Sequence, residues 1–267
     1  MDAVLEAVRE AGRAIEGVRR AGFAVEDKGG AGPVTDADRA ADALLRERLL
    51  AIREVGWLSE ETADDAARLA RESLWVVDPL DGTKEFVKGL PEYVVAVAFV
   101  EHGQSQLAAV HNPSTGETFW AVRGGGAYQD GRRIRVSESA RLLASRSEIR
   151  RGEFEPFAAW EVEPIGSIEL KLAMVAAGRA GATLSRGPKH EWDVCAGALL
   201  VEEAGGMATD VFGGPLRYNQ PFPKVRGVLA GAPGAHARAL VKVRETGASE
   251  RMAEMDGRET GNGKRER

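Results

Sequence analysis

Two stretches near the start of the chain carry apolar residues three or four positions apart, the spacing that gives a helix one apolar face. They are residues 3–21, with Leu5, Val8, Ile15 and Val18, and residues 36–54, with Ala41, Leu45, Leu49 and Ile52. We therefore predict a helix in each stretch. The glycine-rich residues 29–33 that lie between them predict a loop.

The middle of the chain has the pattern of strands instead. Residues 74–77 are apolar without a break, which is typical of a strand covered on both faces. A short strand near 132–136 is expected after the turn at Asp130–Gly131. An antiparallel meander is predicted where three stretches alternate or run apolar with turn residues between them, over residues 92–100, 105–111 and 117–122.

The second half of the chain begins near residue 140 and alternates helix with strand. Helices are expected over residues 167–178, 193–204 and 234–244, and strands over residues 182–184 and 225–230. The polar and charge-balanced end of the chain predicts a disordered tail. The expected organisation is a first subdomain over residues 1–138, a second over 139–246, and a tail over 247–267.

Composition agrees with a soluble enzyme. A chain of 267 residues with 43% hydrophobic content can bury one large core or two cooperating subdomains. The net charge of −5 argues against a general nucleic-acid binder, although local cations and metal ions can still hold a small anionic substrate. Cys195 is the only cysteine, so no intrachain disulfide forms, and its small-residue surroundings favour a core position over a nucleophile.

The sequence also bears on location. No apolar stretch approaches the roughly 20 residues that a membrane span needs. The first residues lack the basic and apolar regions of a signal peptide. We therefore expect a cytoplasmic protein with no membrane partner.

The most informative segment follows the apolar run, and it reads Asp78-Pro-Leu-Asp-Gly-Thr83. Pro79 cannot donate a hydrogen bond to a sheet, so strand pairing should stop near Asp78. Asp78 and Asp81 offer carboxylate oxygens, the Leu80 carbonyl is freed between them, and the next two residues can present N–H groups and a hydroxyl to an anion. This arrangement suits Mg²⁺ with a phosphate. The alternative is an Asp-Pro turn followed by an Asp-Gly turn.

Further acidic residues stand at the ends of other predicted elements. Glu60 and Glu61 follow an apolar pair, and Asp193 opens a helix rich in small residues. Taken alone, paired glutamates are typical of a solvated face and Asp193 of a helix cap. Thr35 with Asp38 resembles a capping box, and a role for Asp38 in a metal site is equally compatible with the sequence. Capping does not explain all of these acids together.

These segments resemble those of a known family. Its four signature segments are matched by Val34-Thr-Asp-Ala-Asp38, Ser59-Glu-Glu61, Asp78 to Thr83, and Trp192-Asp193 followed by Ala196-Gly197. In order and spacing the chain resembles the inositol monophosphatase superfamily of Mg²⁺-dependent, lithium-sensitive phosphatases over roughly residues 1–240. Residues 124–131, leading to residues 134–137, are similar to the hairpin that closes the family's first subdomain.

The resemblance implies the α/β fold of that family and of fructose-1,6-bisphosphatase, a layered αβαβα sandwich. The first subdomain would hold a mainly antiparallel sheet, and the second a smaller mixed sheet. Acids from both would meet in the cleft between them. The family's proteins bind a small phosphate ester, and the chain is expected to act as a monomer or homodimer.

The resemblance also implies roles for individual residues. Two or three Mg²⁺ ions are expected, one held by Glu60, Asp78 and the Leu80 carbonyl, and a second by Asp78, Asp81 and Asp193. The catalytic group would be Glu60, Thr83 and Asp38, with Glu60 and Thr83 orienting the attacking water. The backbone N–H groups of Gly82 and Thr83 would hold the phosphate, and Asp193 would also contact the substrate.

Three details resemble one branch of the family, the 3′(2′),5′-bisphosphate nucleotidases. Thr83 is followed by Lys-Glu-Phe, Leu58-Ser59 precedes the acidic pair, and residues 166–172 resemble that branch's Gly-Ser and Leu-Lys segment. Lys171, Arg186 and Lys189 would then meet the substrate's second phosphate, although Arg186 and Lys189 also fit a solubilising surface. The branch usually reads Gly-Pro-Thr before Trp-Asp, where this chain has Gly187-Pro-Lys-His-Glu191.

The resemblance therefore favours hydrolysis of adenosine 3′(2′),5′-bisphosphate to AMP and phosphate. The first alternative is an inositol-1-monophosphatase or a related sugar-phosphate phosphatase. The second alternative is a regulatory or binding protein on a phosphatase fold, because a fold alone does not fix a function.

Overall fold

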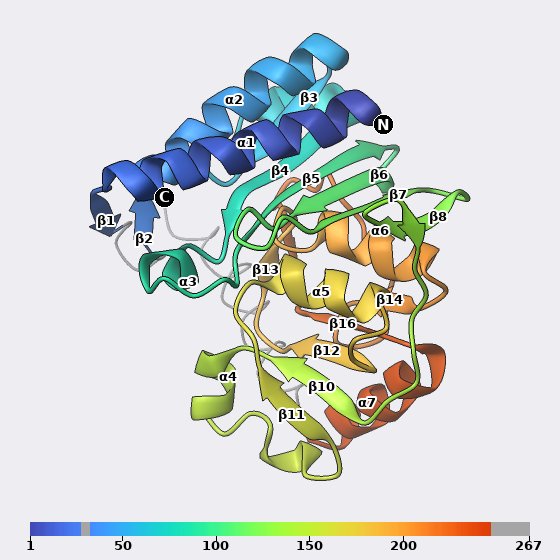
Figure 1. Cartoon of the computed structure of the whole chain (residues 1–267). Coiled ribbons are helices and arrows are strands. Elements are labelled where there is room, and N and C mark those ends of the chain that lie inside the picture. The colour runs from blue at the N-terminus through green and yellow to red at the C-terminus, as the bar shows by residue number, and fades with distance from the viewer. Residues whose placement is uncertain (28–32, 247–267) are drawn as a thin grey trace, which may run out of the picture.

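The computed structural model describes residues 1–27 and 33–246. These residues form alternating layers of helix and sheet, in the order helix, sheet, helix, sheet, helix (Figure 1). This is the predicted layered sandwich. Most of the predicted 29–33 loop and the whole of the predicted tail, residues 247–267, lie outside the described residues.

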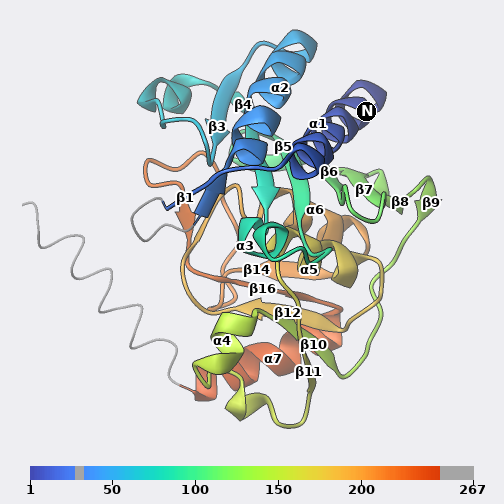
Figure 2. The same cartoon turned by 60° about the vertical axis from the view of Figure 1, so that its left-hand side comes forward.

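Helices α1 (Asp2–Ala21) and α2 (Asp36–Ile52) form the first layer and confirm the predicted helical pair. Both lie over the same face of the first sheet, and α7 lies at the other end of the molecule (Figure 2). Their buried positions include Val8, Ile15 and Leu45, the apolar face that the spacing predicts. A small antiparallel pair, β1 (Val25–Asp27) with β2 (Pro33–Thr35), precedes α2.

The first sheet has seven strands in the order β3-β4-β5-β6-β7-β8-β9. Only β3 and β4 are parallel, and the remaining neighbours are antiparallel. The predicted meander is confirmed as β5, β6 and β7. The strands are β3 (Gly56–Ser59), β4 (Ser73–Asp81), β5 (Val94–Glu101), β6 (Gln104–His111), β7 (Thr118–Val122), β8 (Gly126–Gln129) and β9 (Arg132–Arg133).

The second sheet is smaller and mixed, in the order β11-β10-β12-β16-β14. Strand β10 is parallel to both of its neighbours, and β16 is antiparallel to both of its own. Its strands are β10 (Arg141–Ala144), β11 (Glu161–Pro164), β12 (Ala182–Ser185), β14 (Met207–Thr209) and β16 (Val228–Gly231). A separate antiparallel pair joins β13 (Lys189–His190) to β15 (Lys224–Val225).

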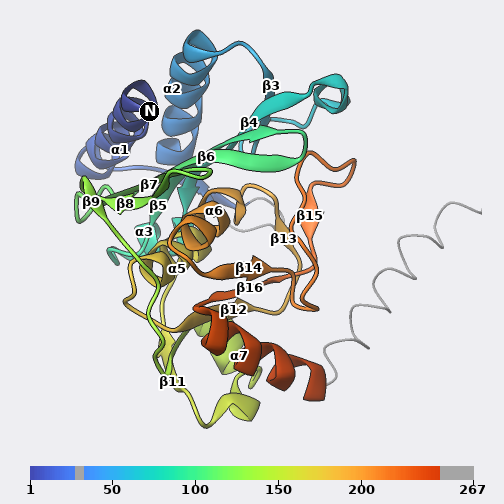
Figure 3. The same ribbon diagram turned by 90° about the vertical axis from the view of Figure 1, so that its right-hand side faces the viewer.

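Helices α5 (Ile168–Ala176) and α6 (Cys195–Glu203) form the layer between the two sheets, and α7 (Pro233–Glu245) covers the outer face of the second sheet (Figure 3). One apolar core runs through the middle layer, with side chains from the first sheet, α5, α6 and the second sheet. The predicted boundary near residue 138 falls between β9 and β10, and the two halves share this core. The shorter helical segments are α3 (Thr83–Val87), α4 (Arg146–Arg150), and the 3₁₀ turns η1 (Ala66–Ala70) and η2 (Glu155–Phe157).

The prediction that strand pairing stops near Asp78 is wrong. Asp78 pairs with Ala96 and Asp81 pairs with Val94, so β4 has one residue more than β5 between these pairs. A bulge of this kind accommodates Pro79, which has no N–H to donate. The strand therefore continues to Asp81, and its irregular end carries both acids.

Two other predicted strands differ from the structure. The strand expected over 132–136 ends at Arg133, because Val136 donates its N–H to the Ala204 carbonyl and so leaves the sheet. The strand expected over 225–230 is divided between β15 and β16. Gly227 lies between them with φ of 68°, a turn conformation that glycine adopts without strain.

Among the described helices, none is long and apolar enough to cross a membrane.

Candidate active site and metal centre

A cleft of about 270 Å³ opens where the two halves of the molecule meet. The first half contributes mainly acidic groups and the turn after β4, and the second half contributes hydroxyls, lysines and one aspartate. The lining residues are Pro33, Glu60, Asp78, Leu80, Asp81, Gly82, Thr83, Lys84 and Glu85 from the first half, and Ser145, Ser147, Ser167, Ile168, Lys171, Ser185, Lys189 and Asp193 from the second.

The end of β4 positions the first acids. Asp78 is buried, and its Oδ1 accepts the N–H of Leu80 at 3.0 Å. Gly82 then turns the chain into α3 with φ of 102°, and a Cβ at this position would lie 2.5 Å from the Glu92 carbonyl oxygen. Only glycine fits this turn. The N–H groups of the first helical turn, which lack partners inside a helix, therefore follow the acids directly.

Thr83 is held by two acceptors. Its Oγ1 lies 3.0 Å from Asp38 Oδ1 and 3.1 Å from the Leu80 carbonyl oxygen. Because neither neighbour can donate, the hydroxyl proton is used on one of them, and the lone pairs of Oγ1 remain to accept a proton from another molecule. Thr83 is thus an acceptor at the cleft surface.

Asp38 has the capping role that the sequence predicted, and it also contacts Thr83 of the cleft. Its Oδ2 accepts the N–H of Thr35 at 2.7 Å, which completes the predicted capping box of α2. Its Oδ1 faces Thr83. Asp38 does not line the cleft, and Thr83 lies between it and the cleft surface.

Residues of the second half contact Asp81 and provide Asp193. Asp81 Oδ2 accepts two hydrogen bonds of 2.6 Å, from Ser167 Oγ and from the N–H of Glu169 at the start of α5. Asp193 Oδ2 accepts the N–H of His190 at 2.8 Å. The helix predicted over residues 193–204 is confirmed as α6, but it begins at Cys195, and Asp193 lies in the turn before it. Asp193 therefore faces the cleft from that turn and does not cap α6.

The carboxylates repel one another. Burial, and then Glu60, Asp81 and Asp193, raise the pKa of Asp78 well above its ordinary value. Burial and Asp81 raise the pKa of Asp193 to about 7. Buried like charges of this kind are costly unless a cation neutralises them.

The donor set fits a hard divalent cation, because every candidate ligand is an oxygen. As the side chains lie, no three acidic, histidine or cysteine groups in the described part of the chain are arranged to coordinate one ion. Asp78, Asp81 and Asp193 accept hydrogen bonds at Oδ1, Oδ2 and Oδ2 respectively. The site therefore has oxygen donors that suit a divalent cation, and the aspartate side chains would rotate when an ion binds.

Two of the three predicted substrate cations face the cleft. Lys171 is 2% exposed, and its Nζ donates to the Ile165 carbonyl at 3.3 Å. Lys189 lines the same wall from β13. Arg186 does not line this cleft. Its guanidinium donates to the Glu153 carbonyl and to Thr246 Oγ1, and it is 9% exposed, so neither substrate contact nor surface solubility describes it.

The sequence interpretation missed two buried glutamates beside the cleft. Glu148 accepts hydrogen bonds from the hydroxyls of Ser145 and Ser185, and the Ser-x-x-Glu spacing at 145–148 is a capping signal that could have indicated it. Glu169 has no local signal, because it stands in an apolar helical segment.

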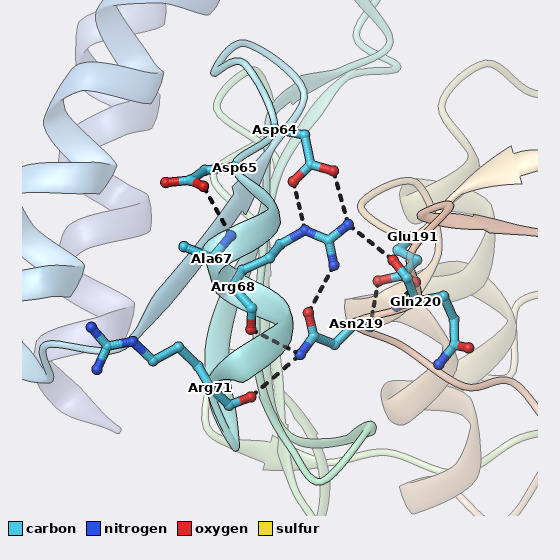
Figure 4. A network of polar contacts seen from close by, with 8 residues as sticks. All are labelled: Asp64, Asp65, Ala67, Arg68, Arg71, Glu191, Asn219 and Gln220. Carbon is cyan, nitrogen blue, oxygen red and sulfur yellow. Dashed lines mark hydrogen bonds and ion pairs between the residues drawn. The ribbon is translucent and has the colours of Figure 1, made fainter.

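A network of polar contacts around Arg68 and Glu191 holds the segment that leads to Asp193 (Figure 4). The Glu191 carboxylate accepts the N–H groups of Asn219 and Gln220, at 2.7 and 2.9 Å. Arg68 of η1 is 3% exposed and donates to Asp64, to Asn219 Oδ1 and to the Gln220 carbonyl. This network joins the segment after Glu60 to the segment before Asp193.

The layered fold, and a cleft with carboxylates from both halves, define a class of phosphate-ester-binding α/β proteins. The chain belongs to the inositol monophosphatase family, whose model matches residues 1–248.

The chain is 36% identical over 231 residues to an inositol-1-monophosphatase of Rhizobium meliloti, covering 80% of this chain and 86% of the relative. It is 31% identical over 232 residues to a 3′(2′),5′-bisphosphate nucleotidase CysQ of Aggregatibacter actinomycetemcomitans, covering 81% and 86%. The solved structure of the extragenic suppressor protein suhB from Bartonella henselae matches with a TM-score of 0.80 and 30% identity, over 91% of this chain and 97% of that one.

These relatives confirm the family and the fold. Nucleotidases are one kind among several, so the comparisons do not select the nucleotidase branch that the sequence favoured.

Proposed function

We propose that this protein is a Mg²⁺-dependent phosphatase that hydrolyses the phosphate monoester of a polyol, with inositol 1-phosphate as the leading substrate. The observation that carries the proposal is the meeting of Glu60, Asp78, Asp81 and Asp193 around one cleft, directly beside the Gly82–Thr83 turn. The name of the Rhizobium relative supports the choice of substrate.

The predicted ligand sets remain our assignment. Glu60, Asp78 and the Leu80 carbonyl would hold one Mg²⁺, and Asp78, Asp81 and Asp193 a second. When bound, the ions would supply positive charge to the phosphoryl oxygens and would make water more acidic. They would also offset the burial and the mutual repulsion that raise the pKa values of Asp78 and Asp193.

The chain's own residues position the reactants. Thr83 Oγ1, its proton committed to Asp38 or to the Leu80 carbonyl, accepts a hydrogen bond from the attacking water. Glu60 lines the cleft and accepts a hydrogen bond from the other hydrogen of that water, which orients the water for attack. The N–H groups of Gly82 and Thr83 hold phosphate oxygens, because they precede the hydrogen-bonded part of α3.

A nucleoside bisphosphate is the second candidate, and one observation favours it. Lys171 and Lys189 stand on the wall opposite the acidic strand end, with the hydroxyl groups of Ser145, Ser147 and Ser185. A substrate with two phosphates would use these cations for the group that does not react. The complete set of carboxylates argues against a purely regulatory protein.

A phosphate-release assay distinguishes these candidates. The wild type is tested with inositol 1-phosphate, 3′-phosphoadenosine 5′-phosphate and fructose 1,6-bisphosphate, with Mg²⁺ and with excess chelator. We expect turnover of inositol 1-phosphate that is lost in chelator. A preference for 3′-phosphoadenosine 5′-phosphate that disappears in K189A would support the second candidate. Full activity in chelator would contradict both.

A further inference from the structure

Glu169 is a buried carboxylate that the mechanism above does not use. It lies in the first turn of α5 with 0% exposure. Its Oε1 accepts the N–H of Ala196 at 3.1 Å, and its Oε2 accepts the N–H of Gly197 at 2.5 Å. Its own N–H donates to Asp81 Oδ2 at 2.6 Å. Glu169 therefore contacts two elements of the candidate metal site. One is the ligand Asp81, and the other is helix α6, which follows the ligand Asp193.

The contact with α6 caps the start of that helix. The N-cap residue of α6 is Val194, which has no side-chain group to accept a hydrogen bond. Glu169 supplies the missing acceptor from the neighbouring helix, for two of the N–H groups that a helix start leaves unpaired. Asp193 immediately precedes this cap, so the position of Asp193 depends on the position of the Glu169 carboxylate.

The space around this carboxylate is matched to it. Gly197 lies in α6, and a Cβ at this position would approach Glu169 Oε2 to 2.5 Å and Leu172 Cβ to 2.4 Å. A larger residue would force α5 and α6 apart or displace the carboxylate. The glycine allows the two helix starts to share one acceptor.

A negative charge at this point is expensive for the fold. Burial of a carboxylate away from water is strongly unfavourable unless partners compensate for it. The neighbouring acids include Asp81 and Asp193, which add repulsion. A neutral capping side chain such as serine or asparagine would satisfy N–H groups at lower cost. A charged carboxylate at this position has a function if it holds the two aspartates at the separation that a cation requires.

We propose that Glu169 is a positioning residue that holds Asp81 and Asp193 at a fixed separation and thereby sets the affinity of the divalent cation that they share. The proposal rests on the metal-dependent function proposed above. It concerns a residue that touches neither the substrate nor the reacting atoms.

The test compares Glu169→Gln with a matched control, Asp210→Asn. Asp210 is also a buried carboxylate that accepts two backbone N–H groups, from Phe212 and Gly214, and it does not line the cleft. Binding of Mn²⁺ to the metal-free full-length proteins is measured by titration calorimetry, and the melting temperature of each is recorded. Phosphate release at saturating Mg²⁺ is measured separately.

We expect both variants to melt at lower temperature than the wild type. Only Glu169→Gln should also bind Mn²⁺ more weakly, by about 10- to 100-fold, as is typical for loss of an outer partner of a metal ligand. Its KM for substrate at saturating Mg²⁺ should stay close to that of the wild type. A merely structural role would lower the melting temperature without changing the metal affinity.

Gly197→Ala provides a second route, because it displaces the Glu169 carboxylate and keeps its charge. It should weaken Mn²⁺ binding in the same direction, including in the case that Glu169→Gln does not fold. Unchanged Mn²⁺ affinity in the folded variants would overturn the proposal for Glu169. If the wild type itself bound no Mn²⁺, the proposed function would fail instead.

Discussion

The two walls of the cleft are built in different ways. On the first wall, Asp78, Asp81 and Thr83 lie within six consecutive residues, and their fixing contacts include neighbours such as Leu80. On the second wall, Asp193 accepts a local hydrogen bond from His190, but the turn that carries it is held by partners far away in the sequence, Asn219 and Gln220. The difference teaches that the order of the first wall is set by a local motif, although Ser167 and Asp38 also contact it, whereas the second wall is a product of the tertiary fold. Changes in the first should impair chemistry without harming the fold, and changes around the second should impair both.

The largest effect is expected from Asp78→Asn. The variant removes a proposed ligand of both ions, so phosphate release should fall by more than the roughly 100-fold that loss of an outer partner causes. The metal-free variant should nevertheless be more stable, by about 1–2 kcal/mol, because burial and neighbouring acids disfavour the charged carboxylate. Activity assays and urea unfolding in chelator check the two effects.

Asp2→Asn is the control for this variant, because it removes a carboxylate from the end of α1 that is remote from the cleft lining. It should leave activity close to that of the wild type. An Asp78→Asn protein that is active, or that is less stable than the wild type without metal, would contradict the account of the first wall.

The second wall is tested by Arg68→Met. Arg68 is buried and pairs with Asp64 at 2.6 Å, and its loss leaves Asp64, Asn219 Oδ1 and the Gln220 carbonyl without this donor. The free energy of unfolding should fall by about 2–3 kcal/mol, less than for a fully buried pair because Asp64 is partly exposed. Urea denaturation measures the change.

The matched control is Arg13→Met, which breaks an exposed ion pair with Glu6 on α1. Exposed pairs contribute little, so the free energy of unfolding should hardly change. Equal effects of the two variants would show that the Arg68 network does not brace the second wall.

The second wall should also make the metal-free protein sensitive to pH. Burial raises the pKa of Glu191 to about 7 in the folded protein, from an ordinary value of 4.5. Between these values the folded state binds more protons than the unfolded state, so the free energy of unfolding falls as pH rises. Asp193, whose pKa is also raised to about 7, acts in the same direction.

Urea unfolding in chelator at pH 5 and pH 7.5 measures this dependence, which we expect to reach roughly 2 kcal/mol for Glu191 alone. Glu191→Gln should make the dependence shallower. A variant with the same slope as the wild type would show that the pKa of Glu191 is not raised in the folded protein.

A smaller effect on stability is expected when two helical glycines are replaced by alanine. Gly197→Ala should destabilise the protein by about 1–2 kcal/mol, because its Cβ meets Glu169 and Leu172. Gly17→Ala in α1 meets no atom within 4 Å and should stabilise the protein by about 0.5–1 kcal/mol. Thermal unfolding of the two variants should give shifts of opposite sign, and shifts of the same sign would argue against close packing at Gly197.

The same contrast explains what the sequence could predict. The helices α1 and α2 and the meander follow from hydrophobic spacing, and the segment from Asp78 to Thr83 shows its chemistry within a few letters. The layered fold followed from resemblance. These features depend on residues that are close in the sequence or on a motif of fixed order.

Features set by distant contacts could not be predicted. Nothing near Glu169 indicates that its carboxylate meets α6, and nothing near Arg186 indicates that it turns toward Thr246. The continuation of β4 past Pro79 depends on its neighbour β5, which accommodates the bulge. Each of these contacts is made with a residue that lies far away in the sequence, so the local sequence does not indicate it.

The central claim is that both walls contribute ligands to shared cations. Its most direct test is the number of Mn²⁺ ions bound per chain at saturation, measured by equilibrium dialysis for the wild type and for Asp193→Asn. The account predicts at least two ions for the wild type, as in two-metal phosphatases, and at least one fewer for the variant. Equal numbers of bound ions in the two proteins would contradict it.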